Sequence, residues 1–243
     1  MLETLGFKLI EYKEIDSTNL EALRLIHNKE IRHNSIILAE EQTAGKGRLK
    51  RNWLSYKGNL HCSIVIVDFK NFSQEVDYLY SYLSAIAVFK ALKELGNLNI
   101  KLKWPNDILL DDKKLAGILI DKTVQGNKLS SIIIGVGVNI EHFPKDKAIL
   151  YPATSLLHSG IKTTQKELAF KILEFFSSRA FKDNYQLVEE FKQNSYRLGE
   201  KIEVRLSNNQ IKKGIFYNLD NSGGLVLKED EESFSTISFG DVS

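Results

Sequence analysis

The feature that most limits the fold of this chain is one long amphipathic segment followed by several strand-like segments. Apolar residues recur every three or four positions along residues 75–96, which predicts a helix with one apolar face. They are Leu79, Tyr82, Leu83, Ile86, Phe89 and Leu92. Strand-like sequences then occupy residues 99–104, 114–122 and 130–140, and residues 107–119 are typical of a hairpin. The chain is therefore expected to combine helices with a sheet that contains at least one hairpin.

The other segments before residue 195 show the same two patterns. The further segments with strand character are 8–16, 35–43 and 59–67. The further segments with helical spacing are 17–26, 163–181 and 186–196. Two of these helices are expected to begin with a capping box, formed by Thr18 with Glu21 and by Thr164 with Glu167.

The sequence changes character near residue 198, where short strand-like runs are separated by Asn, Ser and Gly turns. These runs are 200–206, 211–219, 223–230 and 232–240. They predict a small all-β unit of about 45 residues. A unit of this size has too small a core to be stable alone, so it should pack on the main domain. We therefore expect a main domain at 1–195 and a small β-barrel at 196–243.

Composition limits the class of protein. At 243 residues, with 43% hydrophobic and 26% charged residues, the chain has the composition of an ordinary globular protein. No apolar run approaches the ~20 residues of a membrane helix, and the N-terminal sequence lacks the layout of a signal peptide. The single Cys62 rules out an internal disulfide framework, so a cytoplasmic location is expected and Cys62 is interpreted as a small buried residue.

A cluster of cations lies beside two glycines in the sequence AGKGRLKRNW. Residues 42–67 contain five Lys or Arg and no acid, so with a net charge of +2 the rest of the chain sums to −3. A local cluster of like charges, among them Lys46, Arg48, Lys50 and Arg51, indicates an anionic ligand that binds and leaves. The alternatives are a solvated basic turn and a non-specific nucleic-acid patch.

Three short polar segments are candidates for ligand contacts. Pro105 turns the chain after a strand and places Asn106 and Asp107 at the strand end, although an Asn-Asp turn can also cap its own backbone. Lys114 follows in a strand-like run, on the same face as Ala116 if the strand is regular. The Ser-Thr pair before the 17–26 helix either caps the helix or binds a small polar head group.

Several common catalytic motifs are absent. The basic segment is neither a Walker A sequence nor a dinucleotide fingerprint, and the GVGVNI segment fails the same test. No His-Glu-x-x-His or Gly-x-Ser-x-Gly sequence occurs. The five histidines are scattered without ligand spacing, so no zinc site is expected.

Five motifs occur in one order: STN at 17–19, QTAGKGRLKRNW at 42–53, KWPND at 103–107, KLAGIL at 114–119 and GVGVNI at 135–140. Together they resemble the biotin–protein ligases (biotin–[acetyl-CoA-carboxylase] ligases) in their single-function form. The resemblance implies an α+β fold, with a mixed sheet and flanking helices as in class II aminoacyl-tRNA synthetases, followed by a small Src-homology-3-like barrel. It implies ATP-dependent attachment of biotin to a lysine of a biotin carboxyl carrier protein through biotinyl-5′-AMP.

The resemblance also implies which positions contact ligand. Those expected around biotin are Ser17, Thr18, Asn19, Gln42, Gly45, Lys46, Gly47, Arg48, His61, Lys114 and Gly117. Those expected on the side of ATP and the adenylate are Arg48, Arg51, Trp53, Asn106, Asp107 and Asn139. Lys114 and Arg48 are the expected catalytic residues, and Asp107 is expected to help place Mg²⁺ with the triphosphate.

Two departures from the family pattern stand out. Lys46 replaces an arginine, so a bidentate fork becomes a point charge and retention of the adenylate could weaken. His61 replaces an aromatic residue and brings a proton that could titrate near neutrality.

The resemblance also sets expectations for partners. Only 16 residues precede Ser17, which is too short for the three-helix DNA reader of members that act as repressors, so no DNA partner is expected. No membrane association is expected, and a homodimer is compatible with the family. The nearest alternative is a lipoate or octanoate ligase, although its usual Arg-Arg-x-Ser-Gly-Gly-Gly sequence is absent. An alternative of another class is a nucleotide-sensing or nucleic-acid-binding module.

Overall fold

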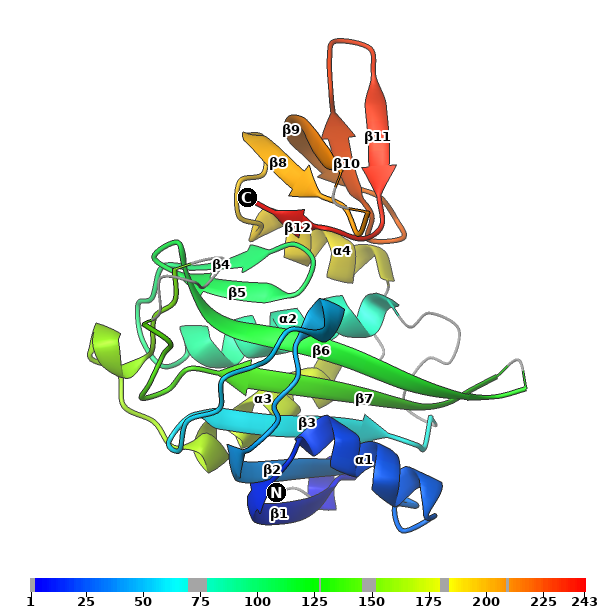
Figure 1. The fold of residues 1–243 in the computed structure, drawn as a ribbon, viewed down its shortest axis with the longest axis vertical. Coiled ribbons are helices and arrows are strands. Elements are labelled where there is room, and N and C mark those ends of the chain that lie inside the picture. The colour runs from blue at the N-terminus through cyan, green and yellow to red at the C-terminus, as the bar shows by residue number, and fades with distance from the viewer. Residues whose placement is uncertain (1–2, 70–77, 127, 146–151, 180–183, 209) are drawn as a thin grey trace.

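The protein consists of a seven-stranded sheet with helices on both faces and a five-stranded sheet packed at one end (Figure 1). The computed structural model describes residues 3–69, 78–126, 128–145, 152–179, 184–208 and 210–243. None of the helices in these ranges is long and apolar enough to cross a membrane. The expected α+β architecture is confirmed.

The elements of the larger unit, in chain order, are η1 (Glu3–Leu5), β1 (Lys8–Ile15), α1 (Thr18–His27), β2 (Ser35–Gln42), η2 (Arg48–Lys50), β3 (Leu60–Ile66), α2 (Tyr78–Lys93), β4 (Ile100–Lys103), β5 (Asp107–Leu110), β6 (Lys113–Gln125), β7 (Lys128–Val138), η3 (Leu157–Ser159), α3 (Gln165–Arg179) and α4 (Asn184–Gln193). The strands of the smaller unit are β8 (Lys201–Arg205), β9 (Ile211–Leu219), β10 (Leu225–Lys228), β11 (Phe234–Ile237) and β12 (Asp241–Val242).

The large sheet has the strand order β1-β2-β3-β7-β6-β5-β4. Only β1 and β2 pair in parallel, and all the other neighbours in this sheet are antiparallel, so the sheet is mixed as expected. The expected hairpin is present between β5 and β6, and its two turn residues, Asp111 and Asp112, have φ values of 48° and 60°. Positive φ at both central positions matches the twist of the strands that such a turn connects.

The two faces of the large sheet are covered by different elements. Helices α2 and α3 cover one face, and α1 and the basic loop (residues 43–59) lie over the other (Figure 1). Along β3, Cys62 and Ile64 pack into the main core, whereas Val65 packs with Ala22 of α1. Farther along the face that carries α1, the strand residues are polar or are glycines. Apolar packing therefore does not cover this part of the face, and a ligand site can form there.

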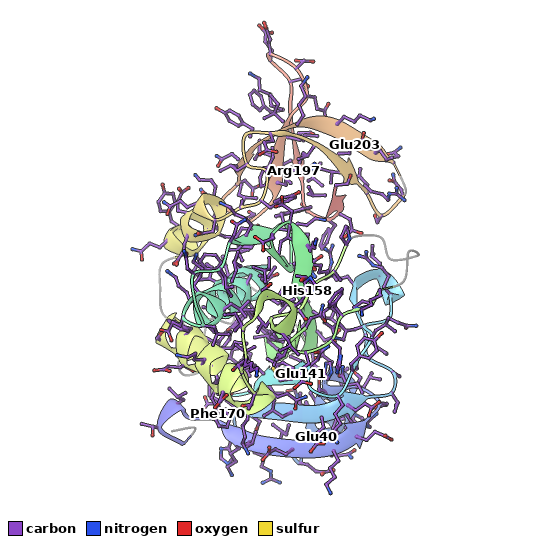
Figure 2. All side chains as sticks on the ribbon, turned by 90° about the vertical axis from the view of Figure 1, so that its left-hand side faces the viewer. Glu40, Glu141, His158, Phe170, Arg197 and Glu203 are labelled. Carbon is purple, nitrogen blue, oxygen red and sulfur yellow. The ribbon has the colours of Figure 1, made fainter. Side chains whose placement is uncertain are left out.

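The smaller sheet has the order β11-β10-β9-β8-β12, with antiparallel pairing throughout. Phe216 and Val204 of this sheet belong to the same buried cluster as Trp104 and Tyr82 of the larger unit. The Tyr82 hydroxyl and the Trp104 indole N–H both donate to the carbonyl oxygen of Gly223, at 2.5 and 3.0 Å. The expected packing of the tail on the main domain is therefore present, and Figure 2 shows the small sheet above the larger unit from a second direction.

One of the two expected capping boxes is confirmed and the other is wrong. At the start of α3, the Thr164 hydroxyl accepts from the Glu167 N–H at 3.2 Å, and the Glu167 carboxylate accepts from the Thr164 N–H at 2.9 Å. Helix α1 instead has Ser17 as its N-cap, without a side-chain capping bond. Glu21 cannot complete a box because its carboxylate already accepts from Tyr12 and Arg24.

Candidate active site

A cavity of about 410 Å³ opens on the face of the large sheet that carries α1. Its floor is the central part of β3, β7 and β6, and its walls are the start of α1, the basic loop and the end of the small sheet. Of the residues expected to contact biotin or ATP, only Gly45 is missing from the lining. The structure therefore brings together side chains from five separate sequence motifs at one place.

The floor of the cavity depends on glycines. Gly117 and Gly137 are direct partners across β6 and β7. A Cβ atom on Gly137 would lie 2.5 Å from the indole of Trp53, and one on Gly117 would lie 3.2 Å from it. Trp53 therefore rests directly on the strand backbone and anchors the basic loop over the sheet. Its indole Nε1 is buried and finds no hydrogen-bond partner among the described residues.

The basic loop itself is a small hairpin. The N–H of Trp53 donates to the Gly45 carbonyl at 2.9 Å, and the N–H of Gly47 donates to the Arg51 carbonyl at 2.7 Å. Gly45 must be a glycine because a Cβ atom there would lie 2.6 Å from the Trp53 carbonyl oxygen. Gly45 thus shapes the loop from behind, although it does not line the cavity.

One end of the cavity is polar and uncharged. Gln42 Oε1 accepts from the backbone N–H of Thr18 at 2.9 Å and from its hydroxyl at 3.2 Å. Ser63 Oγ lies 2.7 Å from the Thr18 hydroxyl and 2.6 Å from Asn19 Oδ1. These bonds fix the orientation of the Thr18 and Gln42 side chains, so this end can recognise a neutral polar group by directed hydrogen bonds.

Asn19 is held from the other side as well. Its amide donates to Asp121 of β6 at 2.7 Å. It lies close over β7, because a Cβ atom on Gly135 would be 2.5 Å from its Oδ1 atom. Ser63 and Asp121 were not predicted as site residues. In the sequence, each of the two is a polar residue within a largely apolar strand. That pattern does not indicate what the side chain contacts.

His61 is buried beside the polar end, with only 1% of its surface exposed. Burial lowers the pKa of its imidazole to about 4, although a 3.2 Å contact between Nε2 and the Tyr56 carbonyl opposes the shift. The ring is therefore neutral at physiological pH, and the expectation that it titrates near neutrality is wrong. In the tautomer in which Nε2 donates to Tyr56, Nδ1 is an acceptor, and it has no partner in the described part of the chain.

The opposite end of the cavity is charged. The ammonium group of Lys114 lies 2.7 Å from Asp107 Oδ1, at an angle that makes an ion pair rather than a good hydrogen bond. It also lies 5.7 Å from the centre of the Trp53 ring. Lys103 is buried behind this pair, and burial lowers the pKa of its ammonium group to about 8.

The expectation that Lys114 shares a face with Ala116 in a regular strand is wrong. Leu109 pairs with Lys114 and Ile108 pairs with Ala116, so the register shifts by one residue at Leu115. This bulge places the Lys114 side chain on the same face as Gly117, where a Cβ atom would lie 3.4 Å from Lys114 Cε. A regular strand would have directed Lys114 into the core beside Ala116. The bulge directs it into the cavity.

Arg48 and Arg51 of the basic loop reach the charged end from above. Arg48 donates to Asn106 Oδ1 at 2.8 Å, and Asn106 in turn donates to the Ile118 carbonyl at 2.7 Å. Burial lowers the pKa of the Arg48 guanidinium, while nearby Asp241 and Asp107 raise it, and the group stays charged. Asp241 belongs to β12 of the small sheet and was not predicted as a site residue.

The remaining expected residues have distinct positions. Asn139 is buried and donates to the Thr154 carbonyl at 3.0 Å, so it fastens the segment after β7 to the cavity wall. Ser17 is buried at the start of α1. Lys46 is exposed at the rim, and the side chain of Lys50 lies outside the described part. In the described ranges, no three His, Cys, Asp or Glu side chains gather as they would around a metal ion.

Comparisons with known proteins agree with this geometry. The model of the Biotin/lipoate A/B protein ligase family matches residues 12–139, and that of the biotin protein ligase C terminal domain matches residues 198–243. The biotin–[acetyl-CoA-carboxylase] ligase of Paracoccus denitrificans is 30% identical over 88% of this chain and 91% of its own length. The bifunctional ligase/repressor BirA of Bacillus subtilis is 34% identical over 59% of this chain and 44% of its own length.

The chain thus spans about half the length of the Bacillus relatives that it matches, at 44% and 55%. Among solved structures, the biotin protein ligase from Aquifex aeolicus in complex with biotin and ATP superposes with a TM-score of 0.79 at 29% identity, covering 97% of both chains. The family match covers residues 12–139, more than half of the chain, and includes most of the residues around the cavity. The chain therefore belongs to the Biotin/lipoate A/B protein ligase family.

Proposed function

We propose that this protein is a biotin–protein ligase that attaches biotin to a lysine of a biotin carboxyl carrier protein through biotinyl-5′-AMP. The observation that carries the proposal is the polarity of the cavity. A neutral, hydrogen-bonding end formed around Thr18 and Gln42 is joined to a cationic end formed around Lys114 and Arg48. Biotin has a neutral ring system at one end and a carboxylate at the other, so it fits this order.

We assign the polar end to the biotin ring system. Thr18 and Gln42 are oriented by their own hydrogen bonds, and Ser17 is placed beside them. Asn19, Gly47, Lys46, His61 and Gly117 also line the cavity, and we assign them to contacts with biotin as well. Directed bonds to a neutral group provide specificity because a ligand that lacks the matching polar atoms leaves buried groups unpaired.

In the first step, the biotin carboxylate attacks the α-phosphorus of ATP and pyrophosphate leaves. We assign Lys114 to the carboxylate and the reacting phosphate, and Arg48 and Arg51 to the phosphates. Asn106, Asp107, Trp53 and Asn139 are assigned to the ATP side. Cations fixed at the point where negative charge accumulates lower the barrier without an enzyme nucleophile. This agrees with the absence of a nucleophile–histidine motif from the sequence.

In the second step, the amine of the acceptor lysine attacks the acyl carbon, and AMP leaves with the electrons of the acyl–phosphate bond. The mixed anhydride is sensitive to water, so the basic loop has to cover it until the acceptor arrives. The close approach of Trp53 to the sheet and the pairing of Lys46 with Asn52 support this covering role of the loop.

Magnesium ion would arrive with the triphosphate. Asp107 is suited to assist only partly, since its Oδ1 atom faces Lys114 at 2.7 Å. A single carboxylate together with phosphate oxygens is nevertheless a common arrangement for Mg²⁺. We therefore propose that Asp107 orients Lys114 and offers its other oxygen to water bound to the ion.

We further propose that residues 1–195 form the catalytic domain and residues 196–243 the small β-barrel domain. The match of the C-terminal family model to residues 198–243 supports this boundary. We propose a cytoplasmic location, because the single cysteine, Cys62, leaves the chain without an internal disulfide framework.

The test is exchange of labelled pyrophosphate into ATP by the purified protein, with biotin, lipoate or octanoate as the only acid present. We expect exchange with biotin alone. Exchange with lipoate or octanoate would instead identify the other activity of the family. Steeply salt-dependent binding of DNA or RNA, with no exchange, would indicate a nucleic-acid-binding module.

A further inference from the structure

A chain of hydrogen bonds connects Asp121 to the polar end of the cavity. The Asn19 amide donates to Asp121 Oδ2 at 2.7 Å, and Asn19 Oδ1 lies 2.6 Å from Ser63 Oγ. Ser63 Oγ lies 2.7 Å from the Thr18 hydroxyl, which in turn lies 3.2 Å from Gln42 Oε1. Asn19, Thr18 and Gln42 line the cavity, whereas Ser63 and Asp121 are not part of its lining. Asp121 is therefore connected to the cavity wall through other side chains.

Regular elements hold the members of this chain in place. Asp121 lies on β6 and Ser63 on β3, while Thr18 and Asn19 begin α1, which packs over β3 and β7 (Figure 1). Thr18, Asn19 and Ser63 are at most 4% exposed. Asn19 has little freedom to move, because a Cβ atom on Gly135 would lie 2.5 Å from its Oδ1 atom. Polar groups buried in this way have to be paired with one another, so few arrangements of the chain are possible.

The carboxylate of Asp121 fixes the direction of the hydroxyl protons along the chain. A carboxylate only accepts hydrogen bonds, so Asn19 has to turn its NH₂ group to Asp121 and its Oδ1 atom to Ser63. Because a carbonyl oxygen cannot donate, the single proton of Ser63 is directed to Asn19 Oδ1. The contact between Ser63 and Thr18 then uses the proton of Thr18, whose distance of 2.7 Å to Ser63 is shorter than its distance of 3.2 Å to Gln42.

This direction leaves acceptors on the cavity side of the chain. With its proton given to Ser63, Thr18 Oγ offers lone pairs alone to a ligand. Gln42 Oε1 accepts from the Thr18 N–H at 2.9 Å and keeps a second lone pair. In the opposite direction, the Thr18 proton would be given to Gln42 and would occupy that lone pair. The direction of the chain thus decides how many acceptors a bound head group meets.

We propose that Asp121 is a positioning residue that sets substrate specificity. Through the hydrogen-bond chain it keeps Thr18 and Gln42 as acceptors, so the cavity selects a neutral head group that donates N–H groups. This inference rests on the proposed function, because the ring urea of biotin is such a head group. The dithiolane ring of lipoate and the hydrocarbon end of octanoate carry no N–H group. Either of them would leave the buried acceptors unpaired, so the same chain discriminates against both.

The experiment measures the binding of biotin to the purified protein by isothermal titration calorimetry. Asp121→Leu removes the acceptor at the end of the chain, so Asn19 can turn over and the proton of Thr18 can move to Gln42. The ligand then loses one acceptor, and the Kd for biotin should rise about three- to tenfold. In pyrophosphate exchange, the KM for biotin should rise by a similar factor, while kcat and the KM for ATP stay nearly unchanged.

Three further variants serve as controls. Asp121→Glu keeps the carboxylate and should bind biotin nearly as well as the wild type. Asp121→Asn keeps an oxygen that can accept from Asn19 but loses the charge, so its Kd should lie between those of the wild type and Asp121→Leu. Gln125→Leu introduces the same side chain at an exposed position of β6 and should leave the Kd unchanged. Equal Kd values in Asp121→Asn and Asp121→Leu would attribute the effect to charge alone and would overturn the proposal.

A second pair of ligands separates the loss of an acceptor from a general loosening of the cavity. Two cyclic carbamate analogues of biotin each replace one ring N–H by oxygen. The analogue that lacks the N–H facing Thr18 and Gln42 should bind the wild type at least about tenfold more weakly than biotin does. In Asp121→Leu that ratio should shrink about three- to tenfold, because one acceptor is already occupied. A ratio that stays the same for both analogues would show that Asp121 has only a structural role.

The outcomes separate this inference from the proposed function. If the wild type binds biotin and Asp121→Leu binds it equally well, the role of Asp121 is refuted and the ligase function stands. Failure of the wild type to bind biotin would refute both. Should Asp121→Leu not fold, the comparison of Asp121→Asn with Asp121→Glu decides the question, because only a carboxylate forces the direction of the chain. Equal Kd values in these two variants would then contradict the proposal.

Discussion

Replacing Lys114 by methionine tests the assignment of this residue to the reacting carboxylate and phosphate. Methionine keeps an unbranched apolar side chain of similar length but removes the ammonium group, which lies 5.7 Å from the centre of the Trp53 ring. Loss of one fixed group aimed at developing charge typically lowers the rate about 10²- to 10³-fold, or about 3–4 kcal/mol. The rate at which Lys114→Met exchanges pyrophosphate into ATP should therefore be at least about 100-fold lower than that of the wild type.

The same substitution should affect stability much less. Asp107 would lose its partner at 2.7 Å, but the two side chains are 29% and 15% exposed, so water can solvate the remaining carboxylate in part. We expect a loss of about 1–2 kcal/mol, between the values for exposed and buried pairs, and a fall in Tm of a few degrees. Thermal unfolding monitored by circular dichroism measures this directly.

Lys113→Met is the matched control, because Lys113 is the adjacent lysine and is exposed. It removes the same charge from the same strand and should retain full exchange. Exchange within tenfold of wild type in Lys114→Met, with the fold intact, would refute the assigned role.

Three further predictions concern other parts of the cavity. Arg48→Ala should release biotinyl-5′-AMP at least tenfold faster and increase biotinylation of bystander proteins. Unchanged release kinetics would contradict that role. Ser63→Ala removes the hydroxyl that orients the polar end, so the KM for biotin should rise about tenfold, in line with a lost buried hydrogen bond, with little change in kcat. The depressed pKa of His61 means that the unfolded chain binds a proton between about pH 6.5 and pH 4 that the folded chain does not. Stability should therefore fall with acidification across that window by up to about 1.4 kcal/mol per pH unit. In His61→Phe, the free energy of unfolding, measured with denaturant at several pH values, should fall less steeply with acidification than in the wild type. An equal dependence on pH in the two proteins would show that the imidazole is not the cause.

Much of the fold follows from local patterns. The capping box at Thr164, the hairpin at Asp111 and Asp112 and the short strands after residue 198 all appear where turn residues and apolar periodicity predict them. In each case the interaction is formed within a few residues of the chain or by one repeating pattern. These elements form as predicted because the tertiary contacts favour the same local conformation as the local sequence does.

The details of the site depend on contacts that no local pattern contains. A single bulge at Leu115 reverses the side of the sheet on which Lys114 lies. The Glu21 carboxylate accepts hydrogen bonds from Tyr12 of the edge strand β1 and from Arg24 of α1, so it does not form the capping box. Asp241 is distant in sequence from the loop that it contacts, and nothing in its neighbours marks it as part of the cavity.

We propose that one cavity holds biotin at its neutral end and activates the biotin carboxylate at its cationic end. The most direct test is to mix the wild-type protein with biotin and ATP, remove free ligand rapidly by gel filtration and quantify bound biotinyl-5′-AMP by mass spectrometry. We expect nearly one equivalent of the adenylate per chain of the wild-type protein, and almost none in Lys114→Met. Recovery of unreacted biotin and ATP alone from the wild-type protein would contradict it.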